Sequence, residues 1–154
     1  MIMTKGLGIL ERIEIAATNL TGAPLVIGGV YALDITRINA ASVDSDTSLT
    51  NVVVTAAANL RCILLVALQA TGVGATARML YKGFGPVLVD GTTPVVPGDR
   101  LIPQAGSPNL IKQPNPSLVN PIGFAMAAQA TAAGTLTPMY FDGGVAWKGE
   151  RAVS

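Results

Sequence analysis

Short apolar runs alternate with polar turns along the chain. A Gly or Pro interrupts the sequence at intervals of roughly 8–15 residues, the spacing expected between short strands. Val, Ile and Thr, which favour strands, are plentiful. In residues 12–16 charged and apolar side chains alternate, as they do along a half-buried strand. The pattern predicts an all-β protein, a single-domain β-barrel or sandwich (β-tulip-like) of short strands.

The turn signals between these runs are specific. Thr71-Gly72-Val73-Gly74 predicts a tight hairpin, Asp90-Gly91 a second hairpin, and Pro97-Gly98 a turn between two short strands. The other runs are bounded by Gly, Pro, Asn or Ala-rich segments. The expected strands away from Pro97-Gly98 are residues 12–16, 25–33 with a break at Gly28-Gly29, 33–38, 49–56, 60–69, 75–82, 86–89, 122–128 and 136–141.

Residues 46–58 allow a second interpretation. Asp46 can cap a helix and three alanines favour one, whereas the β-branched residues 52–55 favour a strand. Residues 39–48 form the longest polar segment and are expected to be an exposed loop. A strand in 49–56 is therefore the main prediction, with the helix as its alternative.

Three segments lie outside the expected strands. Residues 1–10 are expected to form a flexible leader or extended N-terminal arm, residues 103–121 a long loop with five prolines, and residues 143–154 a tail. Long ordered loops in compact domains are usually functional, and contact with a neighbouring subunit is a natural use. Because no repeat or linker divides the chain, residues 1–154 are expected to form one β-rich structural domain.

Composition changes this picture in two ways. Apolar residues make up 50% of the 154 residues and charged residues only 12%, with a net charge of +1. Soluble domains carry about 25% charged residues, so this chain is unusually poor in charge. High apolar content with a low net charge excludes intrinsic disorder. A net charge of +1 also excludes a basic surface that binds nucleic acid. The chain contains no His, which excludes Ser-His-Asp and Cys-His catalysis and histidine metal ligands.

A membrane is one destination for so much apolar surface. Residues 15–33 are uncharged, but they contain Gly, Pro, Thr and Asn and indicate turns and short strands rather than a spanning helix. Glu11, Arg12 and Glu14 cut short any signal peptide. We therefore expect a soluble protein made in the cytoplasm, without membrane or nucleic-acid partners. Its apolar surface is expected to be buried in a core and in an obligate assembly.

Candidate chemistry is sparse. Gly72-x-Gly74-x-x-Ala77, with Asp90 further on, matches part of a dinucleotide-binding fingerprint. Only residues 75–82 could form its helix, and a crossover between parallel strands needs a dozen or more residues. Cys62 is the single cysteine and is expected to be a buried apolar residue. We predict no catalytic, cofactor-binding or metal-binding residues and no enzyme activity, with a dinucleotide-binding enzyme as the remote alternative.

The C-terminal half resembles a known class of proteins. The motifs that carry the resemblance are Val95-Val96-Pro97-Gly98-Asp99-Arg100-Leu101, Pro121-Ile122-Gly123-Phe124-Ala125-Met126-Ala127, Ala133-Gly134-Thr135-Leu136-Thr137 and Tyr140-Phe141-Asp142-Gly143-Gly144. In this order they resemble the small β-rich structural proteins of tailed bacteriophages, notably capsid decoration (cement) proteins, over residues 83–145. The resemblance implies a virion protein that binds the outer surface of the major capsid protein, often as a trimer, and stabilises the shell. No catalytic residues come with it.

Contact residues for such a partner are expected in the segments outside the strands. Another virion component, such as a tail, fibre-base or shell protein, is the alternative function. Trp147 either packs on the chain's own core or inserts into a partner. The predicted contacts are Ile2, Leu7, Ile9 and Leu10 in the leader, Pro103, Leu110, Ile111, Pro114 and Pro116 in the Pro-rich loop, and Trp147 in the tail.

Overall fold

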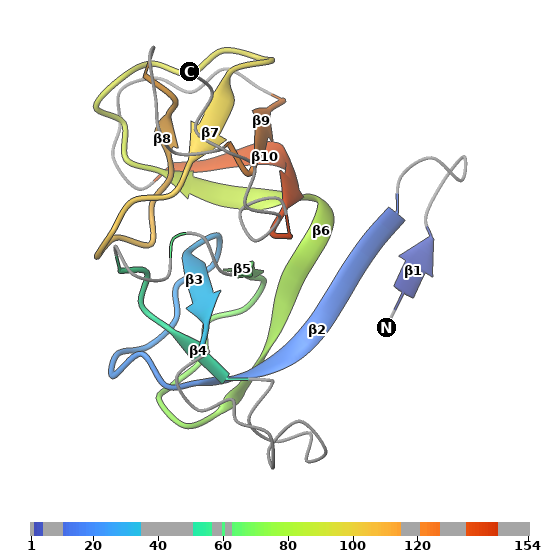
Figure 1. The fold of residues 1–154 in the computed structure, drawn as a ribbon. Coiled ribbons are helices and arrows are strands. Elements are labelled where there is room, and N and C mark those ends of the chain that lie inside the picture. Colours follow the sequence, from blue (N-terminus) through green and yellow to red (C-terminus); the bar gives the residue numbers. More distant parts are fainter. Residues whose placement is uncertain are drawn as a thin grey trace.

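The described part of the chain is built from strands and turns only. The computed structural model describes residues 2–4, 11–34, 51–56, 60, 63–114, 121–126 and 135–144, and ten strands within them join in one hydrogen-bonded sheet (Figure 1). This confirms the all-β prediction, with a sandwich-like sheet rather than a regular barrel. The strands are β1(Ile2–Thr4), β2(Glu11–Asn19), β3(Val30–Leu33), β4(Asn51–Val53), β5(Leu64–Ala67), β6(Thr76–Val89), β7(Arg100–Ile102), β8(Ile111–Lys112), β9(Gly123–Ala125) and β10(Thr135–Asp142).

The longest strand, β6, connects the two ends of the sheet. The sequence predicted two strands here, residues 75–82 and 86–89, because Gly83 and Gly85 interrupt the apolar pattern. This prediction was wrong, because β6 runs unbroken over 14 residues and bends strongly (Figure 1). Gly83 has a φ of 119°, a value that side chains disfavour, so the glycine allows the bend without ending the strand.

The two halves of β6 have different neighbours. Its first half pairs antiparallel with β2 on one edge and with β5 on the other. Its second half pairs antiparallel with β10 over eight residue pairs, from Asp142 opposite Lys82 to Thr135 opposite Val89. The outer strands follow in the order β10-β9-β7-β8. One continuous strand thus holds together a group of strands from the N-terminal half and a group from the C-terminal half.

One predicted hairpin forms and the other does not. The turn after β5 leads directly into β6, so the hairpin at Thr71–Gly74 is confirmed. The hairpin expected at Asp90-Gly91 was wrong, because β7 pairs with β8 and β9 instead of β6. Asp90 instead holds a wider turn: its carboxylate accepts hydrogen bonds from the Thr92 amide and the Gln104 side chain, both at 2.9 Å. The turn at Pro97-Gly98 is confirmed.

Other short strands follow the sequence pattern in part. β4 confirms the strand interpretation over the helix for Asn51–Val53. β9 and β10 match the strands expected at 122–128 and 136–141 within the described residues. The run at 25–33 contributes β3 only after its glycine pair, as the predicted break implied. Residues 35–38 of the expected strand 33–38 and the polar loop 39–48 lie outside the described residues.

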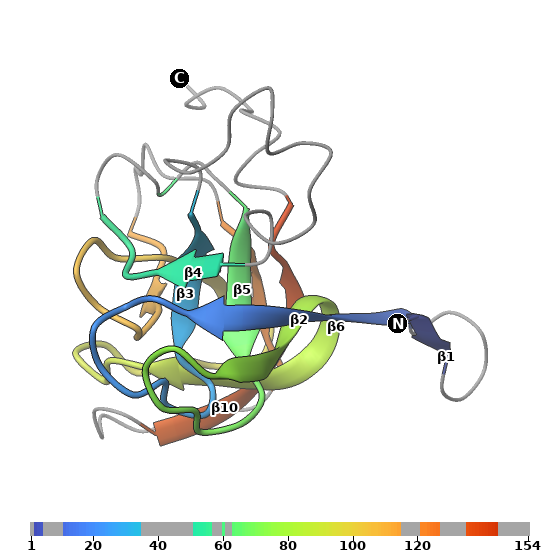
Figure 2. The same cartoon turned by 90° about the horizontal axis from the view of Figure 1, so that it is seen from below.

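The N-terminal arm contains a strand. β1 pairs antiparallel with the start of β2, with Ile2 opposite Ile13 and Thr4 opposite Glu11. In Figures 1 and 2 this two-stranded ribbon lies away from the rest of the molecule. This agrees with the predicted extended arm: residues 2–4 of the segment 1–10 form a strand, and its other residues lie outside the described part of the chain.

The core consists of two clusters of buried side chains. One contains Leu80, Val87 and Val89 of β6, together with residues of β3, β5, β7, β9 and β10. The other contains Met79 and Ala77 of β6 and residues of β2, β4 and β5. Because successive side chains of a strand point to opposite faces, the first half of β6 contributes to both clusters. The second half contributes to only one, and the side chains on its other face, at Phe84, Pro86 and Leu88, are half-buried.

Candidate functional site

The large exposed apolar side chains of the described residues are unevenly distributed. Three of them, Phe124 (43% exposed), Met126 (45%) and Leu136 (47%), belong to β9, β10 and the residue after β9. The others are Val73, in the β5–β6 turn, and Val26, Ile27, Val54 and Val96, none of which belongs to β9 or β10. Single exposed apolar residues are ordinary, whereas a contiguous group indicates an interaction site.

The strand register assembles one apolar face. Directly opposed residues of antiparallel strands have side chains on the same face. Leu136 lies opposite Leu88, Pro138 opposite Pro86 and Tyr140 opposite Phe84, while the intervening residues of β10, such as Met139, point into the core. We call this surface the β10 face; its members are Phe84, Pro86, Leu88, Phe124, Met126, Leu136, Pro138 and Tyr140.

Three aromatic rings form a row across the β10 face. Tyr140 lies opposite Phe84 on one side and opposite Phe124 on the other. The Phe84 and Tyr140 ring centroids are 5.2 Å apart in an edge-to-face arrangement. The Phe124 and Tyr140 rings are nearly parallel, at 20°, with centroids 5.6 Å apart. Such pairs stabilise one another beyond simple burial, so the row is a rigid element of the surface.

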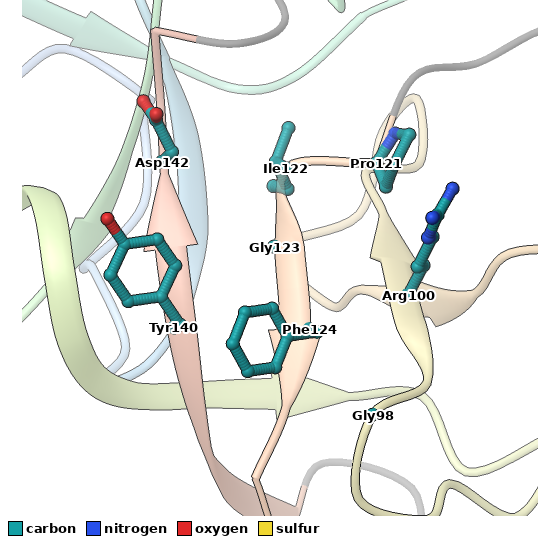
Figure 3. Close-up of a pocket in the computed structure, with 8 residues that line it drawn as sticks. All are labelled: Gly98, Arg100, Pro121, Ile122, Gly123, Phe124, Tyr140 and Asp142. Carbon is teal, nitrogen blue, oxygen red and sulfur yellow. The ribbon is translucent and has the colours of Figure 1, made fainter.

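A shallow pocket of about 310 Å³ opens beside this row (Figure 3). Phe124, Tyr140 and Asp142 form one side, and Arg100 and Pro121 the other (Figure 3). Gly98, Ile122 and Gly123 complete the lining. The volume lies at the lower end of the range typical of small-ligand sites.

Gly123 allows the strands below the pocket to approach closely. A Cβ atom at this position would overlap the carbonyl oxygen of Tyr140, so no larger residue fits without displacing the backbone. β9 is thereby held against β10 and brings Phe124 alongside Tyr140. The glycine-heavy sequence around residue 123 thus positions the aromatic pair.

Polar groups at the pocket are available for further contacts. Within the described part of the chain, no hydrogen bond or ion pair holds the Arg100 guanidinium or the Tyr140 hydroxyl, and Asp142 accepts only from the Gly144 amide, at 3.1 Å through Oδ1. The neighbouring Asp99 is already engaged, since Lys112 lies 2.9 Å away. The Lys112 hydrogen bond, with the Val96 amide, lowers the pKa of Asp99 below its ordinary value. Arg100 is therefore left without an acidic partner in the same turn.

The contact residues predicted from sequence lie elsewhere. Pro103 and Leu110 are buried, and Leu110 belongs to the main core cluster, so neither is available at the surface as a contact requires. The start of the Pro-rich segment is attached to the body, because the Thr55 hydroxyl donates to the Gln104 carbonyl at 2.7 Å. The expectation of a continuous loop over residues 103–121 was wrong for β8, where Ile111 is half-buried.

The other predicted contacts divide into two groups. Pro114 is exposed and Ile2 lies in β1. Leu7, Ile9, Leu10, Pro116 and Trp147 lie outside the described residues, as does Cys62. Of the predicted contacts that the structure describes, none belongs to the β10 face. The sequence of residues 136–141 has no regular polar–apolar alternation, so the alternation of exposed and buried side chains along β10 is seen only in the structure.

The glycine fingerprint at Gly72–Ala77 does not form a dinucleotide-binding turn. The residues that would begin its helix form the start of β6, which returns antiparallel to β5. The described residues also contain no group of three or more Cys, Asp or Glu side chains arranged to hold a metal ion. Nor do they include a long apolar helix of the kind that crosses a bilayer.

The geometry defines a class of fold: a sandwich-like all-β sheet built on one long bent strand. No protein-family model and no curated protein matches the sequence. Among solved structures, the chain is similar to the N base of head fiber gp8.5 of bacteriophage phi29, with a TM-score of 0.53 and 12% identity. The likeness covers 85% of this chain and 94% of the phage chain. At this level of identity the similarity concerns the fold alone.

Proposed function

We propose that this protein is a structural component of a tailed-phage virion, present at the capsid surface. The observation that carries the proposal is the β10 face, an apolar sheet face left uncovered in a chain with few charged residues. Two further observations support it: the fold is shared with the base of a phage head fiber, and the motifs over residues 83–145 resemble those of phage structural proteins.

In its finer form, the proposal is that the chain decorates and stabilises the shell by binding the outer surface of major capsid protein subunits. Burying the apolar side chains of the β10 face supplies the affinity, and repetition around a symmetric shell multiplies it. A homo-oligomer, trimer or dimer, increases this effect further. The role requires no cofactor and no catalytic group, and we assign the protein no enzyme activity.

The arm provides a second contact. A two-stranded ribbon is marginally stable by itself, and β1 with the first residues of β2 lies outside the body (Figure 2). A neighbouring subunit that pairs with or covers this ribbon completes its packing. Contact through the arm with an adjacent protein of the shell is consistent with a stapling role.

A fibre-base component is the second candidate, because the similar solved structure is the base of a head fiber. The two candidates differ in copy number. A decoration protein is present in numbers comparable to the major capsid protein, whereas a fibre base is present in fewer copies. Quantitative mass spectrometry of gradient-purified particles measures this ratio directly.

The decisive experiment compares incorporation of the wild type and two variants. Met126→Asp combined with Leu136→Asp places charges on the β10 face, and we expect incorporation to fall by about tenfold or more. Val73→Asp, at a valine of the β5–β6 turn that is more exposed still (57%), is the control and should be incorporated normally. Absence of the wild-type chain from purified particles would refute the virion role, and equal incorporation of all three chains would refute the β10 face as its contact.

A further inference from the structure

The pocket beside Tyr140 has a composition that the proposed docking role does not require. Apolar docking explains Leu136, Pro138 and Met126, but it gives no reason for unpaired charged and hydroxyl groups at one end of the face. Those groups converge on the same small hollow as the aromatic pair (Figure 3). We therefore considered what kind of molecule would satisfy both sets of groups.

The aromatic pair forms a flat platform. In Figure 3 the Phe124 and Tyr140 rings lie side by side and present their faces outward. Their planes differ by 20°, and Phe124 is 43% exposed, so a ring-shaped ligand can lie across them. The face of an aromatic ring carries partial negative charge and attracts C–H groups with a partial positive charge.

The polar groups stand on both sides of the platform. Arg100 provides several N–H donors from β7, and Asp142 provides a carboxylate oxygen from β10, with the Tyr140 hydroxyl between the platform and Asp142 (Figure 3). A ligand with hydroxyl groups can donate to the carboxylate and accept from the guanidinium at once. A ligand carrying only acceptors, such as a phosphate, would be repelled by Asp142.

We propose that this pocket binds a pyranose sugar. The C–H face of the sugar ring lies on Phe124 and Tyr140, and its hydroxyl groups bind Asp142 and Arg100. A pyranose combines an apolar ring face with groups that both donate and accept hydrogen bonds, and its size suits a hollow of about 310 Å³. The site is open to solvent in the isolated chain, so we expect weak, millimolar binding of a single sugar.

Saturation-transfer difference NMR on the full chain tests the proposal. The probes are the methyl glycosides of glucose, galactose, mannose and N-acetylglucosamine, with methyl glucuronide as an acidic sugar and a thymidine oligonucleotide as a stacking ligand without a pyranose. We expect saturation transfer to the ring protons of at least one pyranose. No transfer to any of the sugars, or transfer to the oligonucleotide alone, would overturn the proposal.

Substitutions in the pocket distinguish a loss of sugar binding from a loss of folding. Phe124→Leu keeps an apolar side chain but removes the ring, and we expect affinity to fall by about tenfold, the size of effect seen when a stacking ring is removed elsewhere. Phe124→Tyr should retain binding, Arg100→Gln and Asp142→Asn should each weaken it, and Val73→Ala should have no effect. Unchanged binding by Phe124→Leu would contradict the platform.

The proposed virion role is tested independently of this site. Sugar binding is measured on the isolated chain, whereas incorporation is measured in purified particles. The Phe124→Leu chain should therefore lose sugar binding and still fold, as judged by an unchanged thermal unfolding midpoint. Each proposal can thus fail while the other stands.

Discussion

The two halves of β6 differ in what covers them. From Thr76 to Tyr81 the strand is paired on both edges, and its alternate side chains enter both core clusters, with Met79 on one side and Leu80 on the other. From Lys82 to Val89 one face is buried at Val87 and Val89, while Phe84, Pro86 and Leu88 on the other face are half-buried. One strand thus contributes side chains to both core clusters at its start and to only one of them at its end.

The difference between the two halves of β6 bears on the composition of the chain, which is rich in apolar residues and poor in charged ones. A chain with 50% apolar residues and 12% charged residues has more apolar surface than its own core covers. Among the described residues, three large exposed apolar side chains, Phe124, Met126 and Leu136, lie on the β10 face, while Val26, Ile27, Val54, Val73 and Val96 are exposed elsewhere. Uncovered apolar area of this kind contributes to association instead of folding, so mutations in the two halves of β6 should affect different properties.

The largest effect is expected from a matched pair of leucines in β6. Leu80→Ala removes a fully buried side chain and leaves a cavity, so we expect the free energy of unfolding to fall by about 2–5 kcal/mol. Leu88→Ala, in the half-covered part of the same strand, should lower it by about 1 kcal/mol or less, since part of its surface is already in water. Urea denaturation of the two variants measures both values. Equal losses would show that the halves are equally covered, contrary to the structure.

A smaller effect is expected at the ion pair that attaches β2 to the first half of β6. Glu14 is only 6% exposed, and its carboxylate lies 2.8 Å from Arg12 Nε and 3.2 Å from Arg78 Nε. Burial by itself raises the pKa of Glu14, but hydrogen bonding from Arg78 and the charges of Arg12 and Arg78 outweigh it, so the pKa is lowered. We expect Glu14→Gln to lower the free energy of unfolding near neutral pH by about 1 kcal/mol, because the exposed Arg78 is screened by water.

The pH dependence of this variant has a defined sign. Because the pKa of Glu14 is lower in the folded protein, its stabilising contribution is fully present above the ordinary value of 4.5 and is lost as the pH falls through the lowered pKa. The difference between wild type and Glu14→Gln should therefore shrink on acidification. Thermal unfolding from neutral pH down to about pH 3 measures it. A difference that grows at low pH would contradict the assignment.

The smallest effect on stability is expected on the β10 face itself. Leu136 is 47% exposed, so Leu136→Ser should change the free energy of unfolding by no more than about 0.5 kcal/mol. The same change should reduce self-association in sedimentation velocity if copies of the chain meet through this face. A large loss of stability would mean that Leu136 is part of the core, and the comparison of the two halves would fail.

The sequence predicted the local elements better than their neighbours. The hairpin at Thr71–Gly74 and the turn at Pro97-Gly98 follow from residues that prefer those backbone conformations, and both form. Asp90-Gly91 carries an equally strong local signal, yet β10 occupies the place beside β6 that a hairpin partner would take. Strand pairing between residues about 50 positions apart depends on the packing of whole faces, which no local pattern contains.

Local sequence patterns also failed to predict the candidate site. The leader and the Pro-rich loop were reasonable contacts because they lie outside strands, but the fold buries Pro103 and Leu110. Phe124 and Tyr140 are 16 positions apart, and their contact depends on the register of β9 against β10 and on the close approach at Gly123. Nothing in either segment alone indicates an aromatic platform.

By itself the sequence determined the class of the fold and its chemical character. β-branched residues and frequent Gly and Pro dictate short strands, the absence of His removes whole classes of catalysis, and the chain combines high apolar content with low charge. Only the tertiary structure decided which apolar run is covered. Each strand has two faces of similar composition, and which one is buried depends on the strands that pack against it, so the β10 face exists only once β6 has bent and β10 and β9 have paired.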